Sequence, residues 1–422
     1  MKARTDFAPL FTAYCPLTPM PLAAVIPKPN AVVEIREFPT PDLEPNSALL
    51  AVELSEVCGT DVYLQQGLLE GVPYPLIPGH VSVGRLEKIR GRVVDVEGNA
   101  FREGDRATFL DVHRTCNACW YCLVAKATTR CPQRKVYGIT YGAEDGLSGG
   151  WAEQVYLKPG TRCIRLEAEP EHFMAGGCAL PTALHAVERG DISIGDTVLV
   201  LGSGPVGLNA IILAQMRGAL RVLCIGAPRQ RLDAALDLGA AAVLNFEEHS
   251  EQERLEWVRN QVLVQMSNIQ PPEIVTSTSS IRIPKSEILP DVTIEATGHP
   301  DAVVEAMRFT RDAGKVVIVG QYTDHGPVSN EVGFNPHLDL NKKHLEVRGC
   351  WGSDFSHFYR AAQIINSLAV RTSATQNPQS KVLSPWAILQ PRLARYTLNH
   401  ANEALAAVAS GSVLKALMEP RL

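Results

Sequence analysis

Four of the ten cysteines lie close together in the stretch TCNACWYCLVAKATTRC, residues 115–131. Cys116, Cys119 and Cys122 are three positions apart, and Cys131 follows in a polar turn. Short Cys-x-x-Cys steps let thiolates converge on one tetrahedral ion, with each sulfur about 2.3 Å from the metal. Four thiolates fill every position around such an ion, so we predict a closed, structural zinc site. The alternative is a group of unrelated buried thiols.

The composition of the chain helps to decide between a zinc site and unrelated buried thiols. The chain has 422 residues, 40 basic and 45 acidic side chains and a net charge of −5, which gives no electrostatic footprint for nucleic acid. The N-terminus lacks the apolar core of a signal peptide, and no apolar stretch reaches the roughly 18 residues of a membrane span. We therefore expect a cytoplasmic protein with neither nucleic-acid nor membrane partners. In a reducing compartment, clustered cysteines more often bind metal or react than form disulfides.

A glycine-rich loop follows the apolar run TVLVL, residues 197–201. In a Gly-x-Gly-x-x-Gly motif placed between a strand and a helix, the first glycine permits a tight turn and the second lets the backbone approach a pyrophosphate. The third allows close helix–strand packing. The alternative is a tight turn without a ligand. The residues predicted to bind a dinucleotide here are Gly202, Gly204, Pro205, Val206 and Gly207.

The next strand, residues 221–225, predicts which dinucleotide binds. NAD-binding proteins have an acidic residue about 20 positions after the glycines, where it binds the ribose 2′-hydroxyl. Gly226 occupies that place here, and Arg229 and Arg231 follow. A guanidinium can bind a 2′-phosphate bidentately, so NADP is favoured over NAD and Gly226→Asp is expected to shift the preference toward NAD. The alternative is that both arginines are solvated.

The secondary structure predicted from the sequence follows two different patterns along the chain. Up to about residue 175 the chain shows short extended runs broken by glycine and proline, whereas from about 186 strands alternate with helices, as in a doubly wound parallel sheet. Two segments follow neither pattern. Residues 1–20 are predicted to form an extension, and the insertion 267–289 is predicted to form a surface loop. Whether this loop acts as a lid is left open. The strands expected outside the parallel sheet are 31–39, 48–57 and 107–112.

Several ordered motifs give the chain a resemblance to a known family. They are VCGTD at 57–61, PGH at 78–80, EGDR at 103–106, SGGWAE at 148–153, LGSGPVG at 201–207 and IEATG at 294–298. With the cysteine lobe, they make the chain resemble the zinc-dependent medium-chain dehydrogenases, which include alcohol, sorbitol and threonine dehydrogenases. The resemblance implies an α/β protein with a Rossmann domain and a mainly β, GroES-like catalytic domain. The implied division is 1–184 catalytic, 185–353 Rossmann and 354–422 a return to the catalytic domain.

The resemblance also implies a second, catalytic zinc, and hence two zinc ions per chain. Carried over motif by motif, its ligands are Cys58, His80 and Cys178, which leave one position open. Thr60 matches the family's hydroxyl beside the zinc and would carry the substrate proton. Tyr63 stands where many members have a proton-relaying histidine.

Other departures from the family pattern raise specific questions. Val81 replaces the glutamate that follows the zinc-binding histidine in many members, so we expect either three protein ligands only, or Glu153 or another carboxylate as a substitute. The interval from Cys122 to Cys131 is one residue longer than usual, which predicts a bulged loop.

The function implied is hydride transfer between a nicotinamide cofactor and a small-molecule alcohol or carbonyl substrate, in a homodimer or homotetramer. The altered metal surroundings leave open ene reduction or a redox-neutral biosynthetic step. A non-catalytic NADP-binding protein is a lesser alternative.

Overall fold

The computed structural model describes residues 20–268, 288–322, 332–374 and 384–422. The predicted N-terminal extension lies almost wholly outside the described residues, and so does the predicted surface loop or lid within 267–289. Within the described ranges, no helix combines the length and the apolar character needed to cross a membrane.

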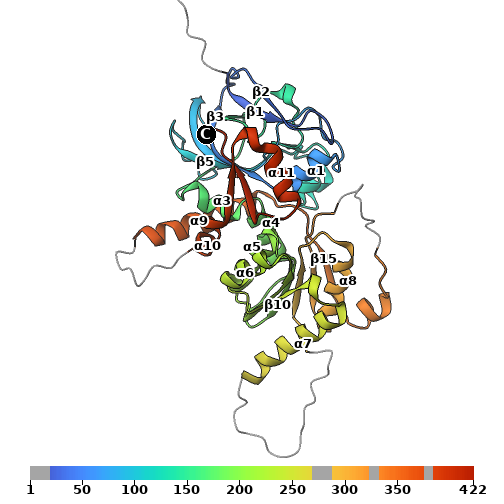
Figure 1. Ribbon diagram of the computed structural model, residues 1–422. Coiled ribbons are helices and arrows are strands. Elements are labelled where there is room, and N and C mark those ends of the chain that lie inside the picture. The colour runs from blue at the N-terminus through green and yellow to red at the C-terminus, as the bar shows by residue number, and fades with distance from the viewer. Residues whose placement is uncertain (1–19, 269–287, 323–331, 375–383) are drawn as a thin grey trace, which may run out of the picture.

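A six-stranded parallel sheet forms the centre of one half of the molecule (Figure 1). Its spatial order is β12-β11-β10-β13-β14-β15, the 3-2-1-4-5-6 order of a doubly wound Rossmann sheet, and every neighbouring pair is parallel. This confirms the predicted fold class. The strands are β10 (Thr197–Leu201), β11 (Arg221–Gly226), β12 (Ala242–Asn245), β13 (Val292–Glu295), β14 (Lys315–Ile318) and β15 (Glu346–Gly349).

Helices cover both faces of this sheet, which explains why the central strand β10, TVLVL, is buried along its whole length. Alternate residues of β10 belong to different cores: Val198 and Val200 pack with one set of helices, and Leu199 and Leu201 with the other. The first set is α4 (Ala179–Arg189), α5 (Pro205–Arg217), α6 (Arg229–Asp237) and α9 (Phe355–Ala374), and the second is α7 (Glu251–Asn268) and α8 (Pro300–Phe309).

A seven-stranded sheet forms the other half, with the order β16-β17-β3-β4-β5-β9 and with β8 paired to β3. All of its pairs are antiparallel except β16 with β17. The strands are β3 (Ser47–Val57), β4 (Ser82–Arg90), β5 (Arg106–Phe109), β8 (Gln154–Leu157), β9 (Cys163–Arg165), β16 (Leu393–Tyr396) and β17 (Lys415–Met418). Since β17 pairs with β3, the C-terminal strands return to the sheet that contains β3, as the red strands beside blue β3 show in Figure 1.

The smaller elements complete this half. Strand β1 (Leu22–Val25) pairs with β2 (Glu34–Glu37), and β6 (Val112–Arg114) pairs with β7 (Lys135–Val136). The short helices are α1 (Gly59–Gln66), α2 (Trp120–Leu123), α3 (Pro170–Gly176), α10 (Pro385–Leu389) and α11 (Ala401–Ala409).

Two of the expected strands differ from the structure. The strand expected over 107–112 is divided, because β5 ends at Phe109 and β6 pairs with a different partner, β7. The strand expected over 31–39 is limited to Glu34–Glu37, which pairs only with β1. The domain boundaries at 184/185 and 353/354 stay a prediction.

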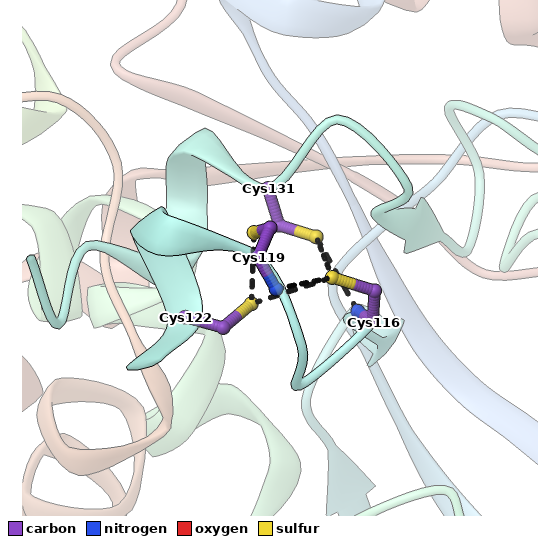
Figure 2. Close-up of side chains that lie close together, drawn as sticks. All are labelled: Cys116, Cys119, Cys122 and Cys131. Atoms are coloured by element: carbon purple, nitrogen blue, oxygen red, sulfur yellow. Dashed lines mark hydrogen bonds between the residues drawn. The ribbon is translucent and has the colours of Figure 1, made fainter. Parts of the chain in front are cut away.

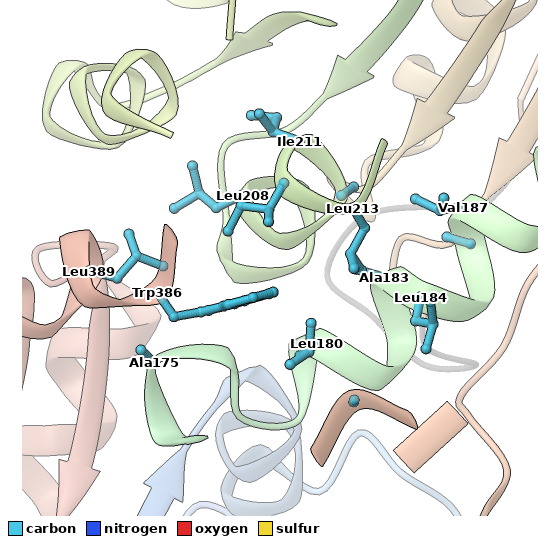
Figure 3. Close-up of a cluster of buried hydrophobic side chains, with 14 of the residues drawn as sticks. Ala175, Leu180, Ala183, Leu184, Val187, Leu208, Ile211, Leu213, Trp386 and Leu389 are labelled. Atoms are coloured by element: carbon cyan, nitrogen blue, oxygen red, sulfur yellow. The ribbon is translucent and has the colours of Figure 1, made fainter. Parts of the chain in front are cut away.

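A buried tryptophan joins the C-terminal segment to the parallel-sheet half. Trp386 of α10 is fully buried in the core that holds Leu180 of α4 and Leu208 of α5 (Figure 3). Its indole Nε1 donates to Asn209 Oδ1 at 2.7 Å. A buried indole usually finds such a partner, and the apolar ring then contributes a large buried area.

Replacing Trp386 with alanine is expected to lower the free energy of unfolding by about 3–5 kcal/mol, because it leaves a cavity and an unpaired buried amide. Urea unfolding followed by circular dichroism measures the loss. Trp351→Ala is the matched control, since that ring is 50% exposed and stacks on Arg130 and Arg134, and it should cost no more than about 1 kcal/mol. Equal losses in both variants would contradict a core role for Trp386.

Candidate metal and cofactor site

Three residues far apart in the sequence meet near the end of β3. The potential ligand atoms of Cys58, His80 and Cys178 lie within 4.8 Å of one another. Cys58 is the N-cap of α1, His80 precedes β4, and Cys178 is the N-cap of α4. The structure therefore brings together all three residues that the resemblance selected.

The spacing of these atoms fits a zinc ion. Cys58 Sγ lies 3.7 Å from His80 Nε2. Zinc–sulfur and zinc–nitrogen bonds of about 2.3 and 2.0 Å at a tetrahedral angle would separate these two atoms by about 3.6 Å. Two thiols and one imidazole are also donors that zinc prefers, and three ligands leave one position open.

The three side chains shift one another's pKa values. A hydrogen bond from Cys178 lowers the pKa of Cys58 to about 7, despite burial. The pKa of Cys178 is raised, because its thiol holds the proton shared with Cys58 and because it is buried. Burial opposes charge on His80, but the adjacent Cys58 and Asp61 outweigh it and raise the imidazole's pKa. A metal ion bound here would displace the protons held on Cys178 and His80, because metal ligands must be deprotonated.

Asp61 holds the first two of these residues in place. Its side chain is fully buried and accepts from Cys58 N at 2.9 Å and from Gly79 N at 3.3 Å. His80 Nδ1, which is buried without a hydrogen-bond partner, lies 3.8 Å from Asp61 Oδ1. The carboxylate thus leaves Nε2 directed at Cys58, an orientation that buried carboxylates commonly impose on metal-binding histidines.

A buried ion pair, which the sequence patterns did not predict, lies beside Cys178. Glu56 Oε1 lies 2.9 Å from Lys415 Nζ, and both side chains are almost completely buried. Glu56 accepts from Cys178 N at 2.7 Å and lies 3.4 Å from Cys178 Sγ. The sequence feature that could have indicated it is the presence of charged residues within two mainly apolar runs: Glu53 and Glu56 in ALLAVELSEV, and Lys415 in LKALM.

Glu153 is not the carboxylate that replaces the missing glutamate. Its Oε2 accepts from Leu22 N at 2.8 Å, at an exposed position beside β1. Val81 is buried among apolar residues that include Leu54 and Val83, so it offers no ligand. The carboxylate found beside Cys178 is Glu56.

Helix α1 carries the two residues predicted to handle protons. Thr60 Oγ1 donates to Gln321 Oε1 at 3.4 Å, and Gln321 follows β14 of the parallel sheet. The hydroxyl of Thr60 thus joins the metal-site half to the other half. Tyr63 is partly buried, and this burial raises the pKa of its phenol above 10. Its hydroxyl therefore stays protonated near neutral pH and can donate a hydrogen bond.

The four-cysteine lobe is a second compact group (Figure 2). The Sγ–Sγ distances are 3.6 Å for Cys119–Cys122, 3.6 Å for Cys116–Cys131 and 4.0 Å for Cys116–Cys122. Tetrahedral zinc–sulfur bonds of about 2.3 Å would give about 3.8 Å. The four sulfurs therefore fit one closed zinc site.

Backbone amides support negative charge within the lobe. The N–H groups of Ala118 and Cys119 donate to Cys116 Sγ at 3.5 and 3.3 Å, and the Cys116 N–H donates to Cys131 Sγ at 3.3 Å. The bond from Ala118 contributes most to lowering the pKa of Cys116 to about 6. The long interval before Cys131 contains a left-handed residue, Lys126, and one turn of 3-10 helix at Thr128–Arg130, in keeping with a bulged loop.

The three glycines of the glycine-rich loop differ in backbone conformation and in the space around them. Gly202 has φ +106°, which favours glycine, and a Cβ on Gly207 would lie 1.9 Å from Gly202 O. Gly204 caps α5, Pro205 occupies the first turn, and a Cβ at Gly204 would meet nothing within 4 Å. The loop is thus closed where helix and strand pack and open at the helix N-terminus, where a phosphate can approach.

The space around Gly226 affects one expectation. A Cβ there would lie 2.4 Å from Ser203 Oγ and 2.8 Å from Ser203 N. The expected change of preference by Gly226→Asp stays a prediction, but it carries a steric cost, because the new side chain would require Ser203 of the glycine-rich loop to shift. Only a structure could reveal this, since Ser203 is distant in sequence.

The two arginines after Gly226 differ in availability. Arg229 is 71% exposed at its side chain and pairs with Asp233 at 2.8 Å, so its guanidinium can be recruited by a ligand. Arg231 Nη2 donates to Val413 O at 3.1 Å and thereby contacts the C-terminal segment. The structure favours Arg229 over Arg231 as the residue for a 2′-phosphate.

Glu295 organises the loops at the carboxyl ends of β13 and β14. It is fully buried and accepts from the N–H groups of Thr297, Gly298 and Gly320, and from the Tyr322 hydroxyl. The carboxyl edge of a doubly wound sheet is where ligands bind. Glu295 thus shapes one wall of the candidate cofactor site.

Comparisons with known proteins agree with this geometry. Residues 44–168 match the alcohol dehydrogenase GroES-like domain, and residues 205–367 match the zinc-binding dehydrogenase family. The chain is 29% identical over 406 residues to 5-exo-hydroxycamphor dehydrogenase of Pseudomonas putida, covering 95% of this chain and 99% of that relative. It is 26% identical over 337 residues to an L-threonine 3-dehydrogenase of Anaeromyxobacter sp. (strain K), covering 78% and 84%.

A solved structure extends the agreement to the whole fold. An alcohol dehydrogenase from Thermotoga maritima matches with a TM-score of 0.79 and 27% identity, covering 95% of this chain and 99% of that one. The predicted combination of a GroES-like domain and a Rossmann sheet is confirmed. The chain belongs to the zinc-dependent medium-chain dehydrogenase/reductase superfamily and is an oxidoreductase of the zinc-type alcohol dehydrogenase kind.

Proposed function

We propose that the protein transfers a hydride between NADP(H) and a secondary alcohol or its ketone, at a zinc held by Cys58, His80 and Cys178. The observation that carries this proposal is the contact between Thr60 and Gln321, because it joins the metal-binding group to the carboxyl edge of the parallel sheet. A reaction that needs both a metal and a dinucleotide requires such a meeting point.

In this proposal, the cofactors supply the chemistry, and residues of the chain handle the substrate proton and position the metal ligands. Bound zinc supplies Lewis acidity to a substrate oxygen, and bound nicotinamide accepts or donates the hydride. Thr60 Oγ1 would accept a hydrogen bond from the substrate hydroxyl and receive its proton for transfer to solvent, while the hydrogen bond to Gln321 Oε1 would orient the Thr60 hydroxyl. Asp61 would keep the Cys58 and His80 segments in register, through its bonds to Cys58 N and Gly79 N.

The substrate class is proposed from a relative that spans nearly the whole chain. That relative is named for 5-exo-hydroxycamphor, a cyclic secondary alcohol. A screen of cyclic secondary alcohols, polyols and amino alcohols, with reduced-nicotinamide absorbance as the readout, tests the proposal. Turnover of a carbon–carbon double bond instead of any alcohol or ketone would favour the ene-reduction alternative.

Metal content separates the two proposed zinc sites. The wild-type chain is expected to hold about two zinc ions, and Cys58→Ser and Cys119→Ser should each lose one. The first variant should lose activity with little change in the unfolding midpoint, whereas the second should unfold more easily, because a closed zinc site contributes to folding. Elemental analysis with thermal unfolding measures both effects. One zinc or none in the wild type would refute the two-site proposal.

Cofactor selection depends on Arg229 in this proposal. NADPH should bind at least as tightly as NADH, and Arg229→Ala should weaken NADPH about 10- to 100-fold, corresponding to the loss of about 1.5–3 kcal/mol in bonds to a charged phosphate. NADH binding should not change. Asp233→Ala, which removes only the partner of Arg229, is the control. A clear NADH preference in fluorescence titrations of the wild type would contradict the proposal.

The hydroxyl of Thr60 provides a test of the proton path. Thr60→Ala should lower kcat about 10²- to 10⁴-fold, the range typical of losing a positioned proton-transfer group, while Thr60→Ser should keep most activity. Steady-state kinetics with zinc content checked in each variant measure this. If alanine and serine behave alike, the proton leaves by another route.

A further inference from the structure

The turn that presents Cys178 is clamped by the buried ion pair at both of its ends. Lys415 Nζ donates to Gly176 O at 2.9 Å, and Glu56 Oε2 accepts from Cys178 N at 2.7 Å. Between them, Gly177 has φ +57°, and a Cβ there would lie 2.1 Å from Glu56 Oε2 and 2.2 Å from Lys415 Nζ. The ion pair therefore occupies the space that a side chain at this turn would need.

The same glutamate contacts the segments of the other two residues. Glu56 lies two positions before Cys58 on β3, and its backbone N–H donates to Val81 O at 2.9 Å, next to His80. Its carboxylate does not join the group of ligand atoms within 4.8 Å of one another, which consists of Cys58, His80 and Cys178 among the described residues. Glu56 thus connects all three segments without being placed as a ligand.

General stability does not explain such a pair. Two charges with 1% and 2% exposed side chains lose their hydration, and an apolar pair of similar volume is often as stable or more so. Glu53, on the same strand, pairs with Arg106 of β5, and these side chains keep 29% and 15% of their exposure, so β3 can carry an ion pair with less loss of hydration. The charges of Glu56 and Lys415 cancel, so the pair adds hydrogen bonds at the turn while leaving the net charge beside the cysteines unchanged.

We propose that Glu56 and Lys415 form a positioning clamp that holds Cys178 within reach of Cys58 and His80, so that metal is retained at this site. Lys415 belongs to β17, so the clamp also makes the metal centre depend on the C-terminal strand. This inference rests on the proposed function, because it requires the three residues to bind a metal. It assigns Glu56 and Lys415 no contact with the substrate.

Zinc release to a chelator tests the clamp, with the four-cysteine zinc as an internal reference. Glu56→Gln and Lys415→Met should each release one zinc about 10- to 100-fold faster than the wild type, the usual effect of removing a group that orients a metal ligand. The second zinc should leave at the wild-type rate. Glu53→Gln is the matched control on the same strand, and Lys415→Arg, which keeps the cation, should stay close to the wild type.

The double variant Glu56→Gln/Lys415→Met separates positioning from folding, because it leaves no unpaired buried charge. The clamp requires fast release of one zinc from this variant even when its unfolding midpoint is restored. Wild-type release rates in a folded double variant would overturn the clamp and leave the proposed metal site intact. A wild-type protein that binds only the four-cysteine zinc would overturn the proposed metal site, and the clamp with it.

Discussion

The antiparallel pairing of β3 with β4 on one side and β17 on the other sets the spacing of the groups in the metal centre. Ser55 pairs with Ser82, so the segment that holds His80 runs beside the end of β3 that leads to Cys58. Val57 pairs with Ala416 and Glu56 with Leu417, so Lys415 lies diagonally across from Glu56, close enough for their 2.9 Å ion pair. A slip of one residue in either pairing would turn the side chains to the opposite face of the sheet. The centre therefore depends on strand register more than on any single side chain.

The parallel sheet contributes its carboxyl edge, where ligands bind in doubly wound folds. Its glycine-rich loop is tight at Gly202 and Gly207 and open at Gly204, while Glu295 ties together the loops at the ends of β13 and β14. Thr60 and Gln321 meet where the two halves approach each other. Trp386 and its neighbours bury an apolar junction beside this edge, so the relation between the halves rests on packing as well as on polar contacts.

The two cysteine groups differ in how far the chain must fold before they exist. Cys116, Cys119 and Cys122 approach one another through local spacing alone, and Cys131 reaches them through one short turn. Cys58, His80 and Cys178 meet only after both β3–β4 pairing and the turn at Gly177 have formed. Periodicity and spacing predict the first group directly. The second was selected only through ordered family motifs, because its members are too distant for any local pattern to pair them.

Local order is what the sequence by itself determined: the alternation of strands and helices, the glycine-rich turn after TVLVL and the four-cysteine lobe all follow from patterns within a few tens of residues. Tertiary structure alone decided which groups have room and which have partners. Ser203 crowds the space that a side chain at Gly226 would need, Val413 engages Arg231, and Lys415 accompanies Glu56 into the interior. The physical reason is that steric exclusion and the burial of a charge depend on atoms brought close by folding, and a linear sequence does not specify those neighbours.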